Sequence, residues 1–160
     1  MMQCRVSQVA LDASSETNED IMVVMNADMF FRKSLSSLVE EAYNHDILLH
    51  LIDDHMSHNQ IQNGVMVFNL KNPKVKDFLK YYNKMWDKNT YPDVYHYLDQ
   101  NHLFKAYNEF KDKLNIGKLN SLYIDGTFNN DAYIWSAHSG NRDLNYVRFV
   151  NEKKRNFEHE

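Results

Sequence analysis

The chain has 160 residues, of which 43% are hydrophobic and 25% charged, a composition that excludes a disordered polymer and suits one globular domain. Its net charge of −4 gives no broad attraction to nucleic acid or anionic lipid, so neither is expected as a partner. No apolar run approaches the roughly 20 residues that span a bilayer, so no transmembrane segment is expected. The single cysteine, Cys4, provides no disulfide framework, and the first residues lack an apolar secretory signal. A cytoplasmic location is therefore expected.

The first half of the chain predicts a buried strand between helices. A continuous apolar run at 21–25 is typical of a strand buried on both faces, as in a mostly parallel sheet. A short helix over 5–13 and a polar loop over 14–20 are expected before it. A helix over 35–44 is expected after it, with Ser34 as a candidate cap.

The remaining elements continue this alternation. They are expected in this order: a strand at 47–52, a strand at 65–70, a helix that begins at Pro73, a helix over 95–113, and short strands near 119–124 and 133–136. Strands that alternate with helices favour an α/β fold. Residues 1–160 are expected to form a single domain, with a charged tail at 152–160 that frays.

Polar residues lie at the ends of two of these strands. Asp28 follows the strand at 21–25, at the end where open α/β sheets bind ligands, and it is placed to meet a cation or a phosphate. Asn63 and Gly64 precede the next strand but one. The glycine permits close approach of a ligand, and Asn63 offers a donor and an acceptor to a polyhydroxylated substrate. Ordinary solvated turns are the alternative in both places.

Two later segments carry further candidates. Asp99 and Gln100 lie within a predicted helix, where they face either a pocket or solvent. His138 ends an aromatic strand, and a neutral imidazole is a good ligand for a metal such as Mn²⁺. The turn that contains Gly140, together with the guanidinium of Arg142, could hold a diphosphate. A hydrogen-bonded histidine and a surface arginine are the alternative.

The other histidines and aromatic residues give weaker signals. The cluster of acids and histidines at 53–58 resembles a metal site but lacks a recognised ligand spacing, so a solvated loop is the better interpretation. Tyr82 and its aromatic neighbours are most simply core residues. The isolated histidines are interpreted as surface or core residues; they are His45, His50, His96 and His102.

Four segments, taken in order, resemble the nucleotide-sugar glycosyltransferases of the GT-A fold, with glycogenin and galactosyltransferases as the nearest type. The segments are Asn-Ala-Asp-Met-Phe-Phe (26–31), Gln-Asn-Gly-Val-Met-Val-Phe-Asn (62–69), Asp-Gln-Asn-His-Leu-Phe (99–104) and Ile-Trp-Ser-Ala-His-Ser-Gly (134–140). The resemblance implies a partial GT-A fold, a mixed sheet with flanking helices. It also implies metal-dependent transfer of a sugar from a nucleotide-diphospho-sugar donor to a glycan or another hydroxyl acceptor.

The resemblance assigns roles on the donor side of such a site. Asp28 matches the last acid of the family's Asp-x-Asp motif and His138 its late histidine, so both would bind Mn²⁺ or Mg²⁺. Asn26 stands where the first acid is found. Arg142 matches a basic residue that contacts the diphosphate, and Gly140 lies in the same turn.

The resemblance also assigns roles around the transferred sugar. Asn63 and Gly64 match a turn on the acceptor side. Asp99 and Gln100 match a pair that lines the sugar pocket near the anomeric carbon, and they are the predicted catalytic residues.

Two departures from the family pattern qualify this assignment. Asn26 removes one negative charge from the metal site, which should weaken the binding of a hard cation. Only 25 residues precede Asn26, where the family has a nucleotide-binding half. The chain is therefore expected to be the C-terminal part of a GT-A domain, with a free sheet edge that invites a partner chain or self-association.

Two other functions stay open from the sequence. One is a non-catalytic carbohydrate- or protein-binding relative of the same fold. The other is a metal-dependent hydrolase that uses Asp28, Asp99 and His138.

Overall fold

The computed structural model describes the chain at residues 6–26, 28–52, 61–85, 98–136, 147 and 150–151. Its named elements are, in chain order, α1 (Val6–Glu16), β1 (Ile21–Met25), β2 (Met29–Phe31), α2 (Ser36–Ala42), β3 (Ile47–Leu51), β4 (Ile61–Asn69), α3 (Pro73–Lys84), α4 (Leu98–Phe110), β5 (Ile116–Lys118), the 3-10 helix η3 (Ser121–Tyr123) and β6 (Ile134–Ser136). The predicted α/β class is confirmed.

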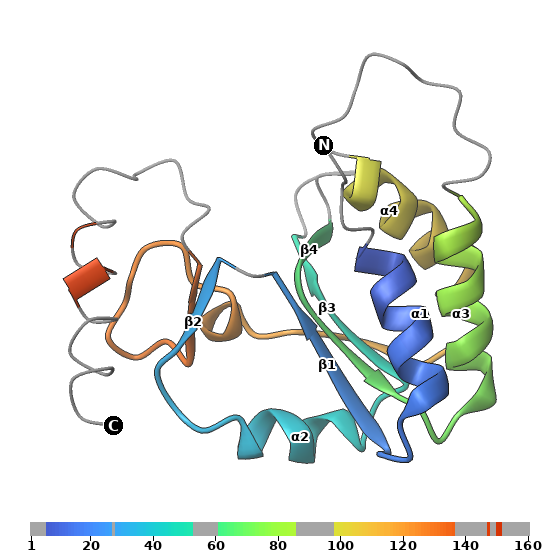
Figure 1. Cartoon of the computed structure of the whole chain (residues 1–160), viewed down its shortest axis with the longest axis horizontal. Coiled ribbons are helices and arrows are strands. Elements are labelled where there is room, and N and C mark those ends of the chain that lie inside the picture. Colours follow the sequence, from blue (N-terminus) through green and yellow to red (C-terminus); the bar gives the residue numbers. More distant parts are fainter. Residues whose placement is uncertain are drawn as a thin grey trace.

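The main sheet has four strands in the order β1-β4-β3-β5 (Figure 1). Strand β4 is antiparallel to both β1 and β3, whereas β3 and β5 are parallel. Strands β1, β3 and β5 therefore run in the same direction, and their carboxyl ends lie at the edge of the sheet where β4 begins. A second, two-stranded sheet pairs β2 with β6 in antiparallel fashion. The sheet is mixed, as the resemblance implied.

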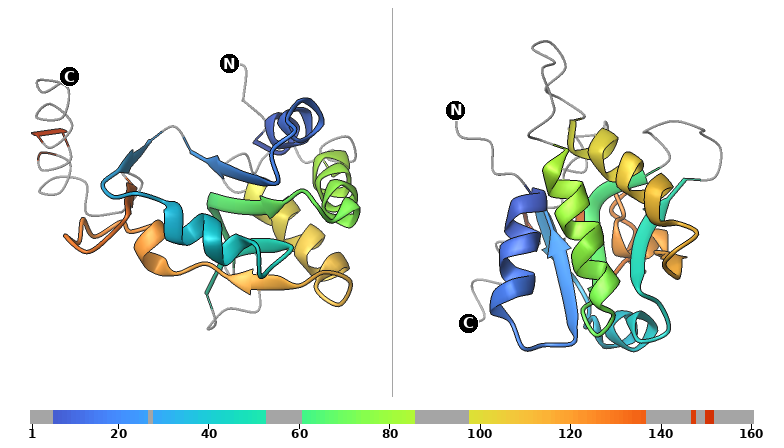
Figure 2. Two further views of the ribbon diagram at one scale, coloured as in Figure 1. Left: turned by 90° about the horizontal axis from the view of Figure 1, so that it is seen from below. Right: turned by 90° about the vertical axis from the view of Figure 1, so that its right-hand side faces the viewer.

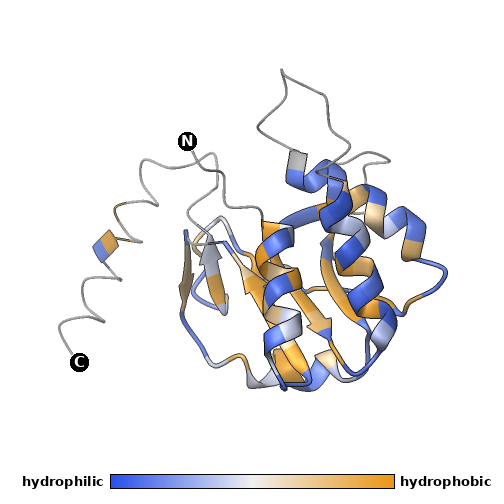
Figure 3. Cartoon of the chain, turned by 45° about the vertical axis from the view of Figure 1, so that its right-hand side comes forward, coloured by the Kyte–Doolittle hydropathy of each residue, from blue (hydrophilic) through white to orange (hydrophobic). Residues whose placement is uncertain are grey.

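Helices cover the two faces of the main sheet unequally. Helices α1, α3 and α4 gather on one face, and α2 lies apart from them (Figure 2). The first core cluster fills the space under α1, α3 and α4, and the second lies under α2, η3 and β6. Apolar residues concentrate on the strands and on the inner sides of the helices, which is the pattern that burial of one helix face requires (Figure 3).

Helix α3 forms where the sequence predicts it. Pro73 occupies its first turn, and the side chain of Asn72 caps it by accepting a hydrogen bond from the Lys74 backbone N–H at 3.0 Å. Its buried residues recur at helical spacing; they are Val75, Phe78, Leu79 and Tyr82. This stripe brings Tyr82 onto the sheet near the start of β4.

The environment of β1 differs from the prediction. Within the described residues β1 pairs only with β4, and Met22 is its single fully buried residue. A strand buried on both faces of a parallel sheet was therefore the wrong interpretation. The apolar run is explained instead by contacts of alternate residues with the two core clusters, since Val24 packs on the first and Val23 on the second.

The strand expected near 119–124 is also wrong. The strand in this region is β5, which ends at Lys118, and the chain then enters η3. The side chain of Asn120 accepts a hydrogen bond from the Leu122 backbone N–H at 2.9 Å, which favours a helical turn over an extended chain.

Smaller differences concern element boundaries. Helix α1 continues to Glu16, through part of the predicted loop. Helix α2 begins after Leu35, with no side-chain cap on its N-cap residue, although the Ser34 hydroxyl accepts a hydrogen bond from the Ser36 backbone N–H. Strand β2 was not predicted. In the described part of the chain, no helix has the length and apolar character that crossing a membrane requires. The predicted tail at 152–160 lies outside the described residues.

Candidate functional site

Two of the predicted polar segments meet where β1 ends. The backbone N–H of Asn26 donates a hydrogen bond to the carbonyl of Gly64 at 3.0 Å, which continues the β1–β4 ladder by one pair. Asp28 follows two residues later, before β2 begins. The segments that carry Asn26, Asp28 and Gly64 are therefore neighbours, although far apart in the sequence.

Asn63 and Gly64 lie inside β4, not in a turn before it as the sequence suggested. A Cβ atom on Gly64 would lie 2.5 Å from the Met29 side chain and 2.6 Å from that of Ile124. A side chain at this position would therefore have to displace the ends of these two side chains, so the close packing against Met29 and Ile124 favours glycine. A role of Gly64 beside a ligand stays a prediction.

An irregularity in β4 controls where Asn63 lies. Leu49 pairs with Met66, but the next residue of β3, His50, pairs with Gln62. The extra residues in β4 reverse its alternation, so that Ile61 packs in the same cluster as Met66. Bulges of this kind change which face of a sheet the following side chains point to. In β4 the change places the Asn63 side chain on the face of the main sheet that α3 and α4 cover.

A polar cluster forms on that face from the buried Tyr82 and the half-buried Asn63 and Asp99. Tyr82 is 0% exposed. Burial raises the pKa of its phenol, and the nearby Asp99 carboxylate adds to the increase, whereas the Asn63 side chain acts in the opposite direction. Burial also raises the pKa of the Asp99 carboxyl group. The causes of the Tyr82 shift place its phenol near both the Asp99 carboxylate and the Asn63 side chain.

Two atoms of this cluster lack partners. Within the described residues, the Tyr82 hydroxyl and the Asp99 Oδ1 atom are buried and accept or donate no hydrogen bond. Unsatisfied buried polar atoms are rare in folded proteins and indicate a place for a water molecule or a ligand. The sequence identified Asn63 and Asp99 as candidates but placed Tyr82 in the core. The only sequence signal for Tyr82 was its position on the buried stripe of α3, one turn after Phe78, and this signal does not show where the hydroxyl lies.

Two further polar residues of α4, Gln100 and His102, follow Asp99 along the helix. The Gln100 Nε2 atom donates a hydrogen bond to the Ile61 carbonyl at 3.1 Å, which ties the start of α4 to the start of β4. The sequence left His102 as either a surface or a core residue, and the structure buries it fully. Burial together with the charge of Lys105 lowers its pKa to about 4. The imidazole is therefore neutral at pH 7.

The predicted metal and diphosphate residues are only partly visible. His138, Gly140 and Arg142 lie outside the described residues, as does the cluster at 53–58. Among the residues that are described, no three His, Cys, Asp or Glu side chains gather as a metal site would need. The half-buried Asp28 and the neighbouring Asn26 supply a carboxylate and an amide oxygen, which are ligands suited to a hard divalent cation.

Replacing Tyr82 with phenylalanine is expected to raise the free energy of unfolding by about 1–2 kcal/mol, because it removes a buried hydroxyl for which the described residues provide no hydrogen-bond partner. Urea unfolding measures the change. The matched control is Tyr81→Phe, one residue earlier on α3 and only partly buried, for which a change near zero is expected. A loss of stability in Tyr82→Phe would show that the hydroxyl is satisfied after all.

Comparison with solved structures gives the fold a family context. The chain is similar to a galactosyltransferase, LgtC, determined with donor and acceptor sugar analogues, at a TM-score of 0.59 and 15% sequence identity, over 89% of this chain and 64% of that one. It is also similar to the glycosyltransferase GlyE of Streptococcus pneumoniae TIGR4, at a TM-score of 0.63 and 13% identity, over 93% of this chain and 42% of GlyE. No family model and no curated sequence matches the chain.

These likenesses show a GT-A-like glycosyltransferase fold. The chain spans less than two thirds of the length of each of these structures. The predicted resemblance is thereby confirmed at the level of the fold.

Proposed function

Because the chain has a GT-A-like glycosyltransferase fold, we propose that it takes part in the transfer of a sugar from a nucleotide-diphospho-sugar donor to a glycan or another hydroxyl acceptor, in a reaction that depends on a divalent cation. The observation that carries the proposal is the partly buried polar cluster of Asn63, Tyr82 and Asp99 at the start of β4, beside the end of β1. A cytoplasmic location remains a prediction.

The polar cluster suits a sugar because its groups match sugar hydroxyls. The Asp99 carboxylate accepts hydrogen bonds, the Tyr82 hydroxyl donates and accepts, and the Asn63 amide does both. The Asp99 Oδ1 atom is buried without a hydrogen-bond partner among the described residues, so a hydroxyl placed there would gain a hydrogen bond that these residues do not supply. We assign Asp99 the role of orienting the sugar and supporting the positive charge that develops at the reacting carbon. Gln100 is assigned the positioning of α4 against β4.

The cation site would be formed by Asp28, with the Asn26 amide oxygen beside it and His138 as a third ligand. A divalent cation bound there supplies positive charge for the diphosphate leaving group. Arg142 and the turn at Gly140 would contact the same diphosphate. Because Asn26 is uncharged, we expect weaker cation binding than two carboxylates would give.

The outer edge of β1 is the proposed place for a partner chain or a second copy. Asp20 and Asn26 make backbone hydrogen bonds at the two ends of the β1–β4 pairing. Along an antiparallel strand the backbone N–H and C=O groups of successive residues face opposite neighbours. The backbone groups of Ile21, Val23 and Met25 therefore point away from β4, toward the outer edge of the sheet. A strand edge with apolar residues favours pairing with another strand. Light scattering of the purified chain tests this point: a mass of 19.1 kDa at all concentrations would contradict self-association.

The alternative function is a non-catalytic carbohydrate-binding relative, and Asn26 favours it because it removes one charge from the cation site. A transfer assay separates the two. The purified chain is incubated with a panel of nucleotide sugars and neutral glycan acceptors, in Mn²⁺ and in EDTA, and the released nucleoside diphosphate is measured. Release that needs both Mn²⁺ and an acceptor supports the transferase. Glycan binding without release supports the alternative.

A further inference from the structure

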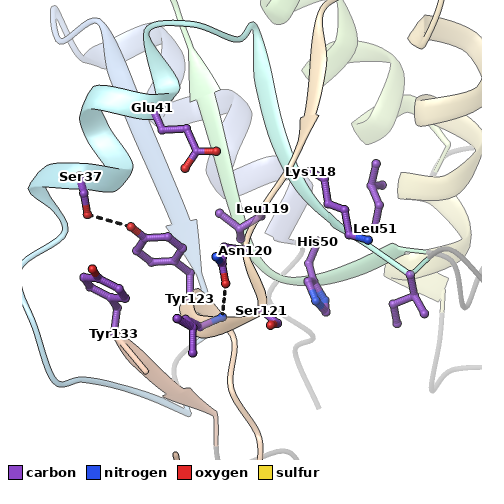
Figure 4. Close-up of a pocket in the computed structure, with 12 residues that line it drawn as sticks. Ser37, Glu41, His50, Leu51, Lys118, Leu119, Asn120, Ser121, Tyr123 and Tyr133 are labelled. Atoms are coloured by element: carbon purple, nitrogen blue, oxygen red, sulfur yellow. Dashed lines mark hydrogen bonds between the residues drawn. The ribbon is translucent and has the colours of Figure 1, made fainter. Parts of the chain in front are cut away.

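A separate pocket opens on the face of the main sheet that α2 partly covers. It has a volume of about 870 Å³, is open to solvent, and is within the size range of small-molecule sites. Ser37 and Glu41 of α2 form one side of it, and His50 of β3 and Lys118 of β5 form another (Figure 4). None of the residues of the Asn63, Tyr82 and Asp99 cluster lines it.

Two tyrosines form a rigid wall of this pocket. The rings of Tyr123 and Tyr133 stack with centroids 4.6 Å apart and planes 27° apart. The Ser37 and Tyr123 hydroxyls share a hydrogen bond of 2.9 Å, which holds the wall against α2 (Figure 4). Tyrosine presents apolar ring atoms and a polar tip together, so such a wall suits a ligand that has both apolar and hydroxyl surfaces.

The charges of the lining balance. Glu41 contributes one negative charge and Lys118 one positive charge. The His50 Nδ1 atom shares a hydrogen bond of 3.0 Å with Gln62, and burial lowers the pKa of His50, so its imidazole is neutral at pH 7. A pocket for a phosphate or a nucleotide would need an excess of positive charge, which this lining lacks.

Neutral hydrogen-bonding groups complete the pocket. Asn120 and Ser121 contribute an amide and a hydroxyl, and Leu119 contributes apolar surface between them. The lining thus combines acceptors, donors and apolar patches without net charge. These are the features by which a protein recognises the hydroxyls and C–H faces of an uncharged sugar.

We propose that this pocket binds a neutral oligosaccharide, with the Glu41 carboxylate accepting hydrogen bonds from sugar hydroxyls and the Tyr123–Tyr133 wall contacting a sugar face. The site differs from the cluster at the start of β4, and it does not depend on transfer activity. A chain that transfers no sugar would still bind a glycan here.

Saturation-transfer difference NMR with maltotriose, cellotriose and chitotriose as probes tests the proposal on the full chain. At least one probe is expected to bind, and Glu41→Ala is expected to weaken its binding about tenfold through loss of a charge-assisted hydrogen bond. Glu40→Ala is the matched control, since Glu40 is the exposed neighbour on the same helix and does not line the pocket. It should bind as the unmodified chain does.

Three results would overturn the proposal. The first is the absence of a signal from every probe at millimolar concentration. The second is equal binding by Glu41→Ala and Glu40→Ala. The third is loss of binding in Asp99→Asn, which would place the saccharide at the strand ends instead. Binding that survives Asp99→Asn supports the pocket; if the unmodified chain then also transfers no sugar, the result counts against the proposed transferase alone.

Discussion

Replacement of Asp99 with asparagine is expected to reduce sugar transfer about 100-fold or more, the effect of removing a group that stabilises charge in a transition state. The carboxylate is buried beside Tyr82, and its Oδ1 atom has no partner among the described residues. An amide of nearly the same size keeps the shape of the site but removes the negative charge. The measurement is kcat/KM for release of the nucleoside diphosphate in the presence of an acceptor.

The same substitution should not unfold the chain. Burial raises the pKa of Asp99, which means that the folded structure already disfavours the charged form, and a neutral asparagine relieves this. The control variant is Glu109→Gln, near the other end of α4, where the carboxylate is exposed and pairs with Lys113. Activity equal to that of the control, in a folded Asp99→Asn protein, would remove Asp99 from the site.

The second large effect is a loss of stability in acid that depends on His102. Its pKa is about 4 in the folded chain and about 6.5 in an unfolded one, so the unfolded chain binds the extra proton between these values. The contribution of His102 is therefore complete above pH 6.5 and is lost as the pH falls toward 4. Lowering the pH from 7.0 to 4.5 should remove about 2–3 kcal/mol of unfolding free energy through this residue.

The comparison of wild type with His102→Gln isolates this contribution. Urea unfolding at pH 7.0 and at pH 4.5 gives the acid-induced loss for each protein, and the carboxylates, Asp99 included, titrate in both. The loss should be larger in the wild type by about 2–3 kcal/mol. Equal losses would mean that the imidazole is accessible to protons in the folded chain.

Elements with a regular pattern of apolar residues could be predicted from the local sequence. The pairing of the strands in the sheet could not. Helix α3 was predictable because a proline, a capping asparagine and a regular apolar stripe agree. The edge position of β1 was not, since an apolar run does not reveal how many neighbours a strand has. The 3-10 turn at Ser121–Tyr123 depends on one side-chain hydrogen bond from Asn120, which competes with an equally apolar strand pattern.

The candidate site shows the same division. Asn63, Asp99 and Gln100 were identified by residue type and by resemblance, and the structure brings all three to the start of β4. Tyr82 was predicted to be a core residue and is one, but the position of its hydroxyl near Asp99 was not predicted. Its role depends on where its hydroxyl lies, which a reversal of side-chain alternation within β4 and the packing of α3 determine together. Such long-range geometry leaves no local sequence signal.

The most direct test of the central claim is calorimetric titration of the purified chain with nucleotide-diphospho-sugars in the presence of Mn²⁺ and in EDTA. We expect donor binding that requires the cation and that Asp28→Ala abolishes. The control variant is Asp20→Ala, which removes an acid at the opposite end of β1 and should leave donor binding unchanged. Binding that is equal in Mn²⁺ and EDTA, or equal in the two variants, or absent for every donor, would contradict a cation-dependent donor site at the strand ends.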